Sequence, residues 1–211
     1  MYVLASLPVI GVLGLIIYSY EPHPLTQRPR LMFIDPETEL SHSLTSHNSL
    51  LSLHSARILP PSHPSHIITL RVCQALLSII GPVEGRQWEI YVVGDDSVEN
   101  ALVIPCGKIF VFTGLLKRVR TEAELAAVLS HELGHVLSRH GAEEMGFQHL
   151  STLFTDLLHS TLYTLTLNLP FFSDIAGRSI DSTKEYITSM PYSRMCEREA
   201  DVIGIYLMSM A

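Results

Sequence analysis

The pattern of apolar and polar positions predicts helices and strands over the second two thirds of the chain. Residues 66–80 are mostly apolar and stop at Gly81, which predicts a helix and its end. Residues 87–93 alternate between apolar and polar side chains, as in a half-buried strand. Residues 101–105 and 108–113 predict two more strands joined by a short turn.

A long helix is predicted to begin at Thr121, which stands three residues before Glu124 as in a capping box. It should run to His140 and end at Gly141, because glycine is a usual residue just past a helix. A final helix is expected at about residues 194–210. These elements predict an α+β fold that is mostly helical, with a small sheet or hairpin.

Two further apolar stretches raise the question of a membrane. Residues 1–20 carry no charge and no basic segment precedes them, so we expect a transmembrane anchor there and not a secretory signal. A buried first helix, or a chain that begins inside a longer precursor, is the alternative. Residues 146–172 are interrupted by His149, Asp156 and His159, so we expect a buried or interfacial helix more than a second membrane span.

Between the anchor and the predicted domain, residues 21–63 are expected to form a connector. Prolines interrupt this part of the chain repeatedly, and serine and histidine fill much of the rest. Five histidines in or just after this segment are irregularly spaced, so we expect a solvated linker and not a metal site. They are His42, His47, His54, His63 and His66. The predicted organisation is therefore an anchor at 1–20, a connector at 21–63 and a compact domain at 64–211.

Composition removes several classes of protein. The chain is 47% hydrophobic and 17% charged, which is not the composition of a disordered chain. Its formal net charge of −7 disfavours a nucleic-acid partner, because such proteins carry a basic excess. The cysteines are Cys73, Cys106 and Cys196, and they form no CxxC pair. Neither a disulfide framework nor a cysteine zinc site is therefore indicated.

The sequence His131-Glu132-Leu133-Gly134-His135 lies inside the predicted long helix. His131 and His135 are four residues apart and share one face, so both imidazoles can bind one zinc ion. Glu132 projects beside that face and can take a proton from a zinc-bound water as a general base. The alternative is a pair of core histidines that are hydrogen-bonded to their neighbours.

A catalytic zinc usually has three protein ligands, and Glu197 is the best candidate for the third. Asp201 shares a helix face with Glu197 and can accept a hydrogen bond from a ligand histidine. The alternative for both is an exposed acidic face paired with arginines. We expect Glu199 to be a solvated charge, and we expect His140 to cap carbonyl groups near the helix end.

Two segments carry a resemblance to a known family. HELGH, followed by SRMCEREADVIG, resembles the membrane-associated gluzincins that include the CAAX prenyl endopeptidases and the HtpX heat-shock proteases. Within them, residues 85–143 and the segment EPHPLTQRPRLMFI resemble the mitochondrial inner-membrane endopeptidases whose activity overlaps the m-AAA protease. The resemblance covers about residues 20–35 and 85–211. One departure is Cys106-Gly107, where the family usually has two glycines.

The resemblance implies a zincin-like (gluzincin) domain with one zinc ion. It implies His131, His135 and Glu197 as ligands, Glu132 as the general base and Asp201 as a hydrogen-bond partner of a ligand. It also implies a membrane-tethered zinc metalloendopeptidase of the mitochondrial inner membrane that cleaves membrane proteins in quality control. Contact with membrane lipid, homo-oligomers and further helices after the last residue of this chain belong to the same expectation.

Zincin sites commonly hold an extended substrate against the edge of a sheet. We expect that edge at Asn100, Ala101, Leu102 and Val103, because the nearby Pro105 suits an edge strand. A plain hairpin arm is the alternative. Two other functions stay open: a catalytically inactive membrane scaffold that keeps a structural metal or none, and a CAAX- or HtpX-type protease of another membrane.

Overall fold

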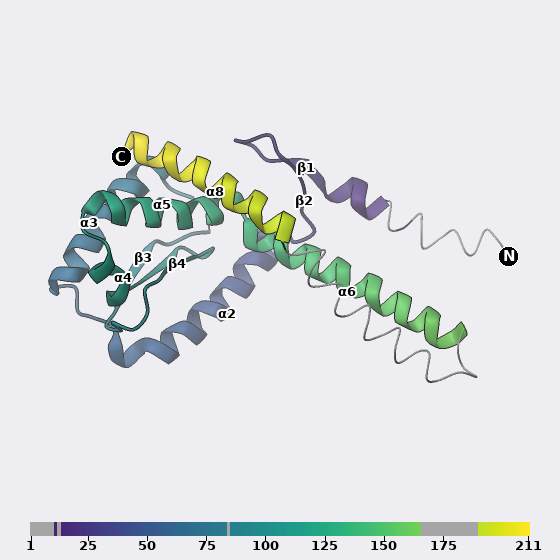
Figure 1. Ribbon diagram of the computed structural model, residues 1–211, viewed down its shortest axis with the longest axis horizontal. Helices are drawn as coiled ribbons and strands as arrows, with labels where there is room; N and C mark the ends of the chain where they lie inside the picture. Colours follow the sequence, from purple (N-terminus) through teal and green to yellow (C-terminus); the bar gives the residue numbers. More distant parts are fainter. Residues whose placement is uncertain (1–10, 12–13, 84, 166–189) are drawn as a thin grey trace. The chain divides into compact units, whose positions relative to one another are not determined.

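The computed structural model describes residues 11, 14–83, 85–165 and 190–211 (Figure 1). Its helices are α2 (Pro36–His54), the short 3-10 helix η1 (Ser55–Arg57), α3 (Pro64–Ile80), α4 (Thr113–Arg118), α5 (Glu122–Ser138), α6 (His140–Leu165) and α8 (Met190–Met210). Its strands are β1 (Tyr20–Pro22), β2 (Pro29–Leu31), β3 (Glu89–Val93), β4 (Ala101–Ile104) and β5 (Lys108–Phe112). The predicted α+β class, mostly helical with a small sheet, is confirmed.

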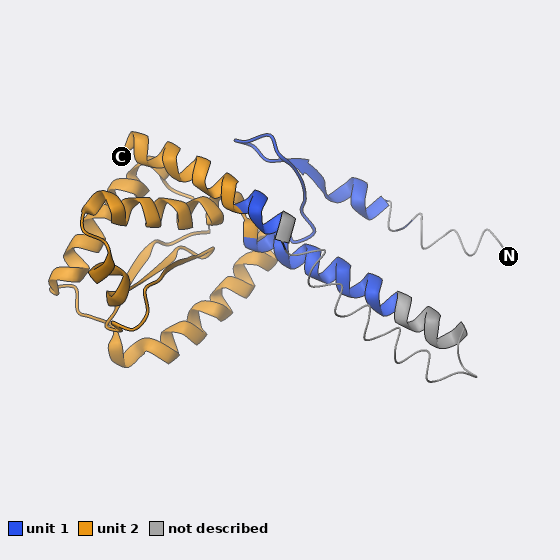
Figure 2. Ribbon diagram, viewed as in Figure 1, with its two compact units in different colours: residues 1–34, 141–196 blue, residues 35–140, 197–211 orange. Residues whose placement is uncertain are grey.

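The chain divides into two compact units, which Figure 2 shows in different colours. Unit 1 comprises residues 1–34 and 141–196, and unit 2 comprises residues 35–140 and 197–211. Two boundaries between the units fall inside α6 and α8, after His140 and after Cys196. Each unit is therefore made of two separate segments of the sequence. All residues of the predicted metal site belong to unit 2.

Unit 2 is built on a three-stranded sheet with the order β3-β5-β4. β3 runs parallel to β5, and β4 pairs antiparallel with β5 through a tight turn. The predicted strands at 87–93, 101–105 and 108–113 are therefore confirmed. Because β5 lies in the centre, β4 forms one edge of this sheet.

The two faces of the sheet bury different clusters, because neighbouring residues of a strand point to opposite faces. One face carries Ile109 and Val111 into a core with side chains of α3, α5 and α8. The other face carries Phe110 and Phe112 into a second cluster, against which Leu40 and other side chains pack. Every residue of β5 is buried, which explains why residues 109–112 are all apolar. The first residue, Lys108, forms an ion pair with Glu89.

The expected connector is not a linker throughout, because residues 36–54 of it form α2. Pro36 stands in the first turn of this helix, where it starts the helix and does not break it. Asp35 caps the helix by accepting hydrogen bonds from backbone N–H groups of the first turn. Two of its histidines pack on aromatic rings of the sheet: His47 lies 6.2 Å from Phe110, and His54 lies 5.2 Å from Phe112, between ring centroids.

The predicted end of α3 before Gly81 and the predicted start of α5 at Thr121 are confirmed, and the predicted end of α5 is not. α3 ends at Gly81, and α5 begins with Thr121 accepting a hydrogen bond from the backbone of Glu124 at 3.1 Å. α5 does not continue to His140, however, because Arg139 takes a left-handed conformation with φ 59°. The chain therefore turns one residue before His140, which begins α6.

Unit 1 contains the antiparallel pair β1 and β2 together with most of α6. Arg28 donates two hydrogen bonds to the carboxylate of Glu143 on α6, at 2.8 and 2.6 Å. Phe147 stacks on Tyr192 with ring centroids 5.8 Å apart. The segment before α2 is therefore attached to α6 by a buried ion pair.

The predicted membrane segments lie partly outside the described residues. Residues 1–10 and 12–13 of the expected anchor are not described, nor are residues 166–172 of the second apolar stretch. Residues 146–165 lie in α6, which exposes the large side chains of Leu153, Phe154 and Leu157. No helix among the described residues has both the length and the apolar character of a membrane span.

Candidate metal centre

The motif helix α5 is held in unit 2 by an apolar stripe on its inner face. Leu125, Leu129 and Leu133 of this stripe are at most 1% exposed and join the core cluster of α3 and β5. His131 and His135 lie beside the stripe and are each 25% exposed. The packing therefore fixes the helix while the two imidazoles reach the protein surface.

Two glycines let α8 approach α5 closely. A Cβ on Gly134 would lie 2.8 Å from the carbonyl oxygen of Ala200, and a Cβ on Gly204 would lie 3.1 Å from the backbone nitrogen of His131. Side chains at either position would push the helices apart. The small residues therefore bring the acidic residues of α8 to the histidines of α5.

Three side chains converge where the two helices meet. The Nε2 atoms of His131 and His135 lie 3.1 Å apart. The Glu197 carboxylate lies 3.2 Å from His131 Nε2 and 3.5 Å from His135 Nε2. Within the described parts of the chain, these three residues form a group whose possible metal-ligand atoms all lie within 4.8 Å of one another. The structure thus brings together the three residues that the sequence predicted as ligands.

Asp201 lies next to this group, as the sequence predicted. Its Oδ1 atom lies 2.9 Å from His131 Nδ1, on the opposite side of the ring from the converging Nε2. An ionised carboxylate only accepts hydrogen bonds, so Nδ1 carries the proton and donates it. In the neutral ring, Nε2 of His131 is then left as a bare lone pair that faces His135 and Glu197.

The surroundings shift the pKa values of two residues in the motif. Burial, followed by the nearby His140, lowers the pKa of His135 to about 4. This favours the neutral ring that metal binding requires. Burial is also the largest cause that raises the pKa of Glu132; His131 lowers that pKa and Glu197 raises it. A half-buried carboxyl with a raised pKa is a common property of proton-transferring groups.

Two predictions about neighbouring residues are wrong. Glu199 is not solvated: it is 5% exposed, and its Oε2 lies 2.9 Å from His140 Nε2. His140 does not cap α5, since that helix ends earlier; its Nδ1 lies 2.9 Å from His135 Nδ1. Glu199 lies on the face of α8 that buries Ala200 and Ile203. Its position one and four residues before these apolar side chains was the sequence signal for its burial.

The four predicted substrate-contacting residues lie on β4 or directly before it. β4 packs against α5 and has a sheet neighbour on one side, β5. The backbone N–H of Phe112 donates to the carbonyl of Asn100 at 3.1 Å. Because bonding alternates along an antiparallel pair, Leu102 also faces β5, while Ala101 and Val103 direct their backbone groups to the free edge. The strand is thus both a hairpin arm and a sheet edge.

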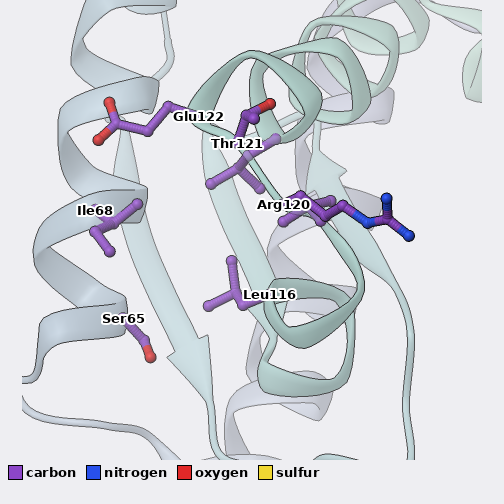
Figure 3. Close-up of a pocket in the computed structure, with 8 residues that line it drawn as sticks. Ser65, Ile68, Leu116, Arg120, Thr121 and Glu122 are labelled. Carbon is purple, nitrogen blue, oxygen red and sulfur yellow. The ribbon is translucent and has the colours of Figure 1, made fainter.

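A separate cavity of about 210 Å³ lies between α3 and the segment that joins α4 to α5 (Figure 3). Ser65 and Ile68 line one side of it, and Leu116, Arg120, Thr121 and Glu122 are among the residues on the other. Two of its polar side chains already have partners, since Glu122 pairs with an arginine of α3 and the Thr121 hydroxyl caps α5. The cavity includes no residue of the histidine cluster.

Comparison with known proteins finds similarity over the part of the chain that holds the candidate metal centre. The model of peptidase family M48 matches residues 71–211, which contain both the histidine helix and the acidic helix. The mitochondrial metalloendopeptidase OMA1 of Schizosaccharomyces pombe is 31% identical over 188 residues, which cover 89% of this chain and 52% of that protein. The mitochondrial metalloendopeptidase OMA1 of Saccharomyces cerevisiae is 31% identical over 214 residues, which cover 96% of this chain and 58% of that protein.

The human metalloendopeptidase OMA1, described as mitochondrial, is 29% identical over 211 residues. That match covers 98% of this chain and 40% of the human protein. The chain therefore spans about half the length of the curated relatives that it matches. The similarity extends beyond the motif, because it includes nearly all of this chain.

Proposed function

The chain belongs to peptidase family M48, and we propose that it is a zinc metalloendopeptidase whose zinc ligands are His131, His135 and Glu197. Glu132 is the general base in this proposal, and Asp201 orients His131. The substrate is a protein segment bound in extended form.

The spacing of the three converging side chains carries the proposal. Bonds of about 2.0–2.2 Å in a tetrahedral zinc site place neighbouring ligand atoms about 3.3–3.6 Å apart. Here the two Nε2 atoms lie 3.1 Å apart, Glu197 Oε2 lies 3.2 Å from His131 Nε2, and the other carboxylate oxygen, Oε1, lies 3.5 Å from His135 Nε2. Two imidazole nitrogens and one carboxylate oxygen are also a ligand set that zinc uses in peptidases. The residues present therefore fit the ion that the family implies.

When bound, zinc supplies a Lewis acid that polarises the scissile carbonyl and acidifies water. Glu132 accepts the proton of the attacking water and returns it to the nitrogen of the leaving amine. Burial raises the pKa of Glu132, which makes the carboxylate a better proton acceptor for the first of these steps. Asp201 keeps the proton of His131 on Nδ1 throughout.

The free edge of β4 is the proposed place for the substrate backbone. Ala101 and Val103 direct their backbone groups to this edge, and β4 packs against the helix that carries Glu132. An extended segment that adds to the edge would form main-chain hydrogen bonds with these two residues. Asn100 Oδ1 accepts from the Ala101 N–H at 2.9 Å, so an entering segment exchanges partners with this amide.

We further propose that the protein works in mitochondria on membrane proteins of the inner membrane, in quality control. The names of the relatives, which are mitochondrial metalloendopeptidases, support the compartment. The inner membrane and the substrate class rest on the resemblance described above. Fractionation of mitochondria that carry a tagged copy of the chain tests the location, with matrix, inner-membrane and outer-membrane proteins as markers.

Cleavage of an unstructured protein such as casein tests the activity. The zinc-loaded full chain is compared with Glu132→Gln and with Glu144→Gln, which changes an exposed glutamate of α6. We expect Glu132→Gln to lose about 10²–10⁴-fold in rate while binding zinc as the parent does. Glu144→Gln should cleave at the parental rate.

Other outcomes would contradict parts of the proposal. Equal cleavage by the parent and Glu132→Gln would show that Glu132 is not the base or that a contaminant cleaves. Zinc binding by the parent without cleavage would favour the inactive scaffold. A parent that binds no zinc would remove the metal site itself.

A further inference from the structure

We propose that His140 and Glu199 position the ligand His135, by holding its proton on Nδ1 so that Nε2 is free for the metal. Both are positioning residues, since they act through His135. The proposal rests on the zinc site described above and adds two residues to it.

The argument starts at Glu199, which is 5% exposed and lies 2.9 Å from His140 Nε2. A carboxylate accepts hydrogen bonds, so Nε2 of His140 is the donor. In this proposal His140 is in its neutral form, so its Nδ1 has a lone pair that accepts a hydrogen bond. That atom lies 2.9 Å from Nδ1 of His135, so His135 is the donor of the second hydrogen bond. The proton of His135 is thereby fixed on Nδ1.

The result matches what Asp201 does for the other histidine. Asp201 holds the proton of His131 on Nδ1 directly, and Glu199 holds that of His135 through His140. Both Nε2 atoms are left bare and face each other at 3.1 Å. Two bare lone pairs at this distance repel each other, and a bound cation removes the repulsion. The two hydrogen-bond chains therefore prepare the pair of nitrogens for a metal ion.

The local backbone shows how His140 reaches its place. In a continued α5, residues five apart would not share a face. The left-handed conformation of Arg139, with φ 59°, ends α5 and turns the chain so that the His135 and His140 rings lie 4.9 Å apart between centroids. A residue with a Cβ rarely adopts this conformation. The side chain of Arg139 is held by the buried Glu39, whose Oε2 accepts from its Nε at 2.6 Å.

The experiment measures zinc affinity by competition with a chromophoric chelator. The double variant His140→Leu/Glu199→Leu removes the hydrogen-bond chain from Glu199 to His135. Both partners are replaced together, so neither is left as a buried charge without the other. We expect it to bind zinc about 10–100-fold more weakly than the parent. The variant His140→Asn/Glu199→Gln keeps an acceptor at the position of Nδ1, and we expect its affinity within about threefold of the parent. His66→Leu, at a buried histidine of α3, is the matched control.

A second measurement does not depend on variants or on zinc. Long-range proton–nitrogen NMR correlation in the metal-free parent reports which nitrogen of His135 carries the proton. A proton on Nδ1 supports the proposal, and a proton on Nε2 overturns it. Parental zinc affinity in a folded His140→Leu/Glu199→Leu variant would also overturn it. If the parent itself takes up no zinc, the proposed function fails, and the NMR result still decides this inference.

Discussion

Gly134 packs so closely on the backbone of Ala200 that a Cβ on the glycine would lie 2.8 Å from the Ala200 carbonyl oxygen. Gly134 stands between the two histidines of α5, and Ala200 stands between Glu197 and Asp201 of α8. The contact therefore sets the distance between the two halves of the candidate metal centre. Both the stability of unit 2 and its affinity for zinc should depend on it.

We expect Gly134→Ala to lower both the stability of unit 2 and its affinity for zinc. The added methyl group meets backbone atoms that cannot rotate away, and overpacking of this kind costs about 1–3 kcal/mol in free energy of unfolding. Thermal unfolding and zinc competition measure the two effects. Gly141→Ala is the matched control, since a Cβ there meets nothing within 4 Å. An unchanged unfolding midpoint and zinc affinity in Gly134→Ala would show that the helices do not lie this close.

Asp201 accepts a hydrogen bond from His131 at 2.9 Å and should therefore affect metal affinity without binding the metal. We expect Asp201→Leu to weaken zinc binding about 10–100-fold, because the ring loses the partner that fixes its proton on Nδ1. Asp201→Asn keeps an acceptor oxygen and should lose less. Asp156→Leu, at an exposed position of α6, controls for the change of residue type. If all three variants bind zinc as the parent does, Asp201 is only an exposed acidic residue.

Local sequence signals predicted most elements of unit 2. The run before Gly81, the alternation before the turn at Gly94 and the capping residues around Thr121 each involve residues close together in the chain. The helix at residues 36–54 was not predicted, because the composition of this segment is polar and prolines usually interrupt helices. What stabilises α2 is the aromatic face of the sheet, formed by residues far along the sequence, among them Phe110 and Phe112.

In the candidate metal centre too, local spacing was predictable and contacts between residues distant in the sequence were not predictable from that spacing. Helix periodicity predicted that His131 and His135 share one face and that Glu197 and Asp201 share another. That these faces meet was predicted from the usual number of zinc ligands and from the family resemblance. The role of His140 was not predictable in this way, since it depends on a left-handed turn at Arg139 and on Glu39, which lies 100 residues earlier in the chain. The burial of Glu199 was predictable, because it shares a helix face with the apolar positions Ala200 and Ile203.

The edge of β4 gives a prediction that separates substrate binding from folding. The N–H of Val103 points to the free edge, so Val103→Pro removes a donor that the sheet does not use. We expect kcat/KM for casein to fall about tenfold or more, with a small change in unfolding midpoint. Leu102→Pro is the contrasting variant, because the N–H of Leu102 faces β5 and its loss costs about 1–3 kcal/mol of stability. Full activity in a folded Val103→Pro would place the substrate elsewhere.

Cys73 gives a prediction for alkaline pH, well away from the metal centre. Its thiol is fully buried in the core of unit 2, and burial raises its pKa from 9.0 to about 12. Between these values the unfolded chain releases the proton and the folded chain keeps it, so the stability contributed by this group is present below pH 9 and is lost as the pH rises towards 12. From about pH 8 to about pH 10.5 the loss is about 2 kcal/mol, or about 4–8 °C in unfolding midpoint. Cys73→Ala should lack this part of the decline when each protein is compared with itself at the two pH values. Equal declines would show that Cys73 is not buried as described.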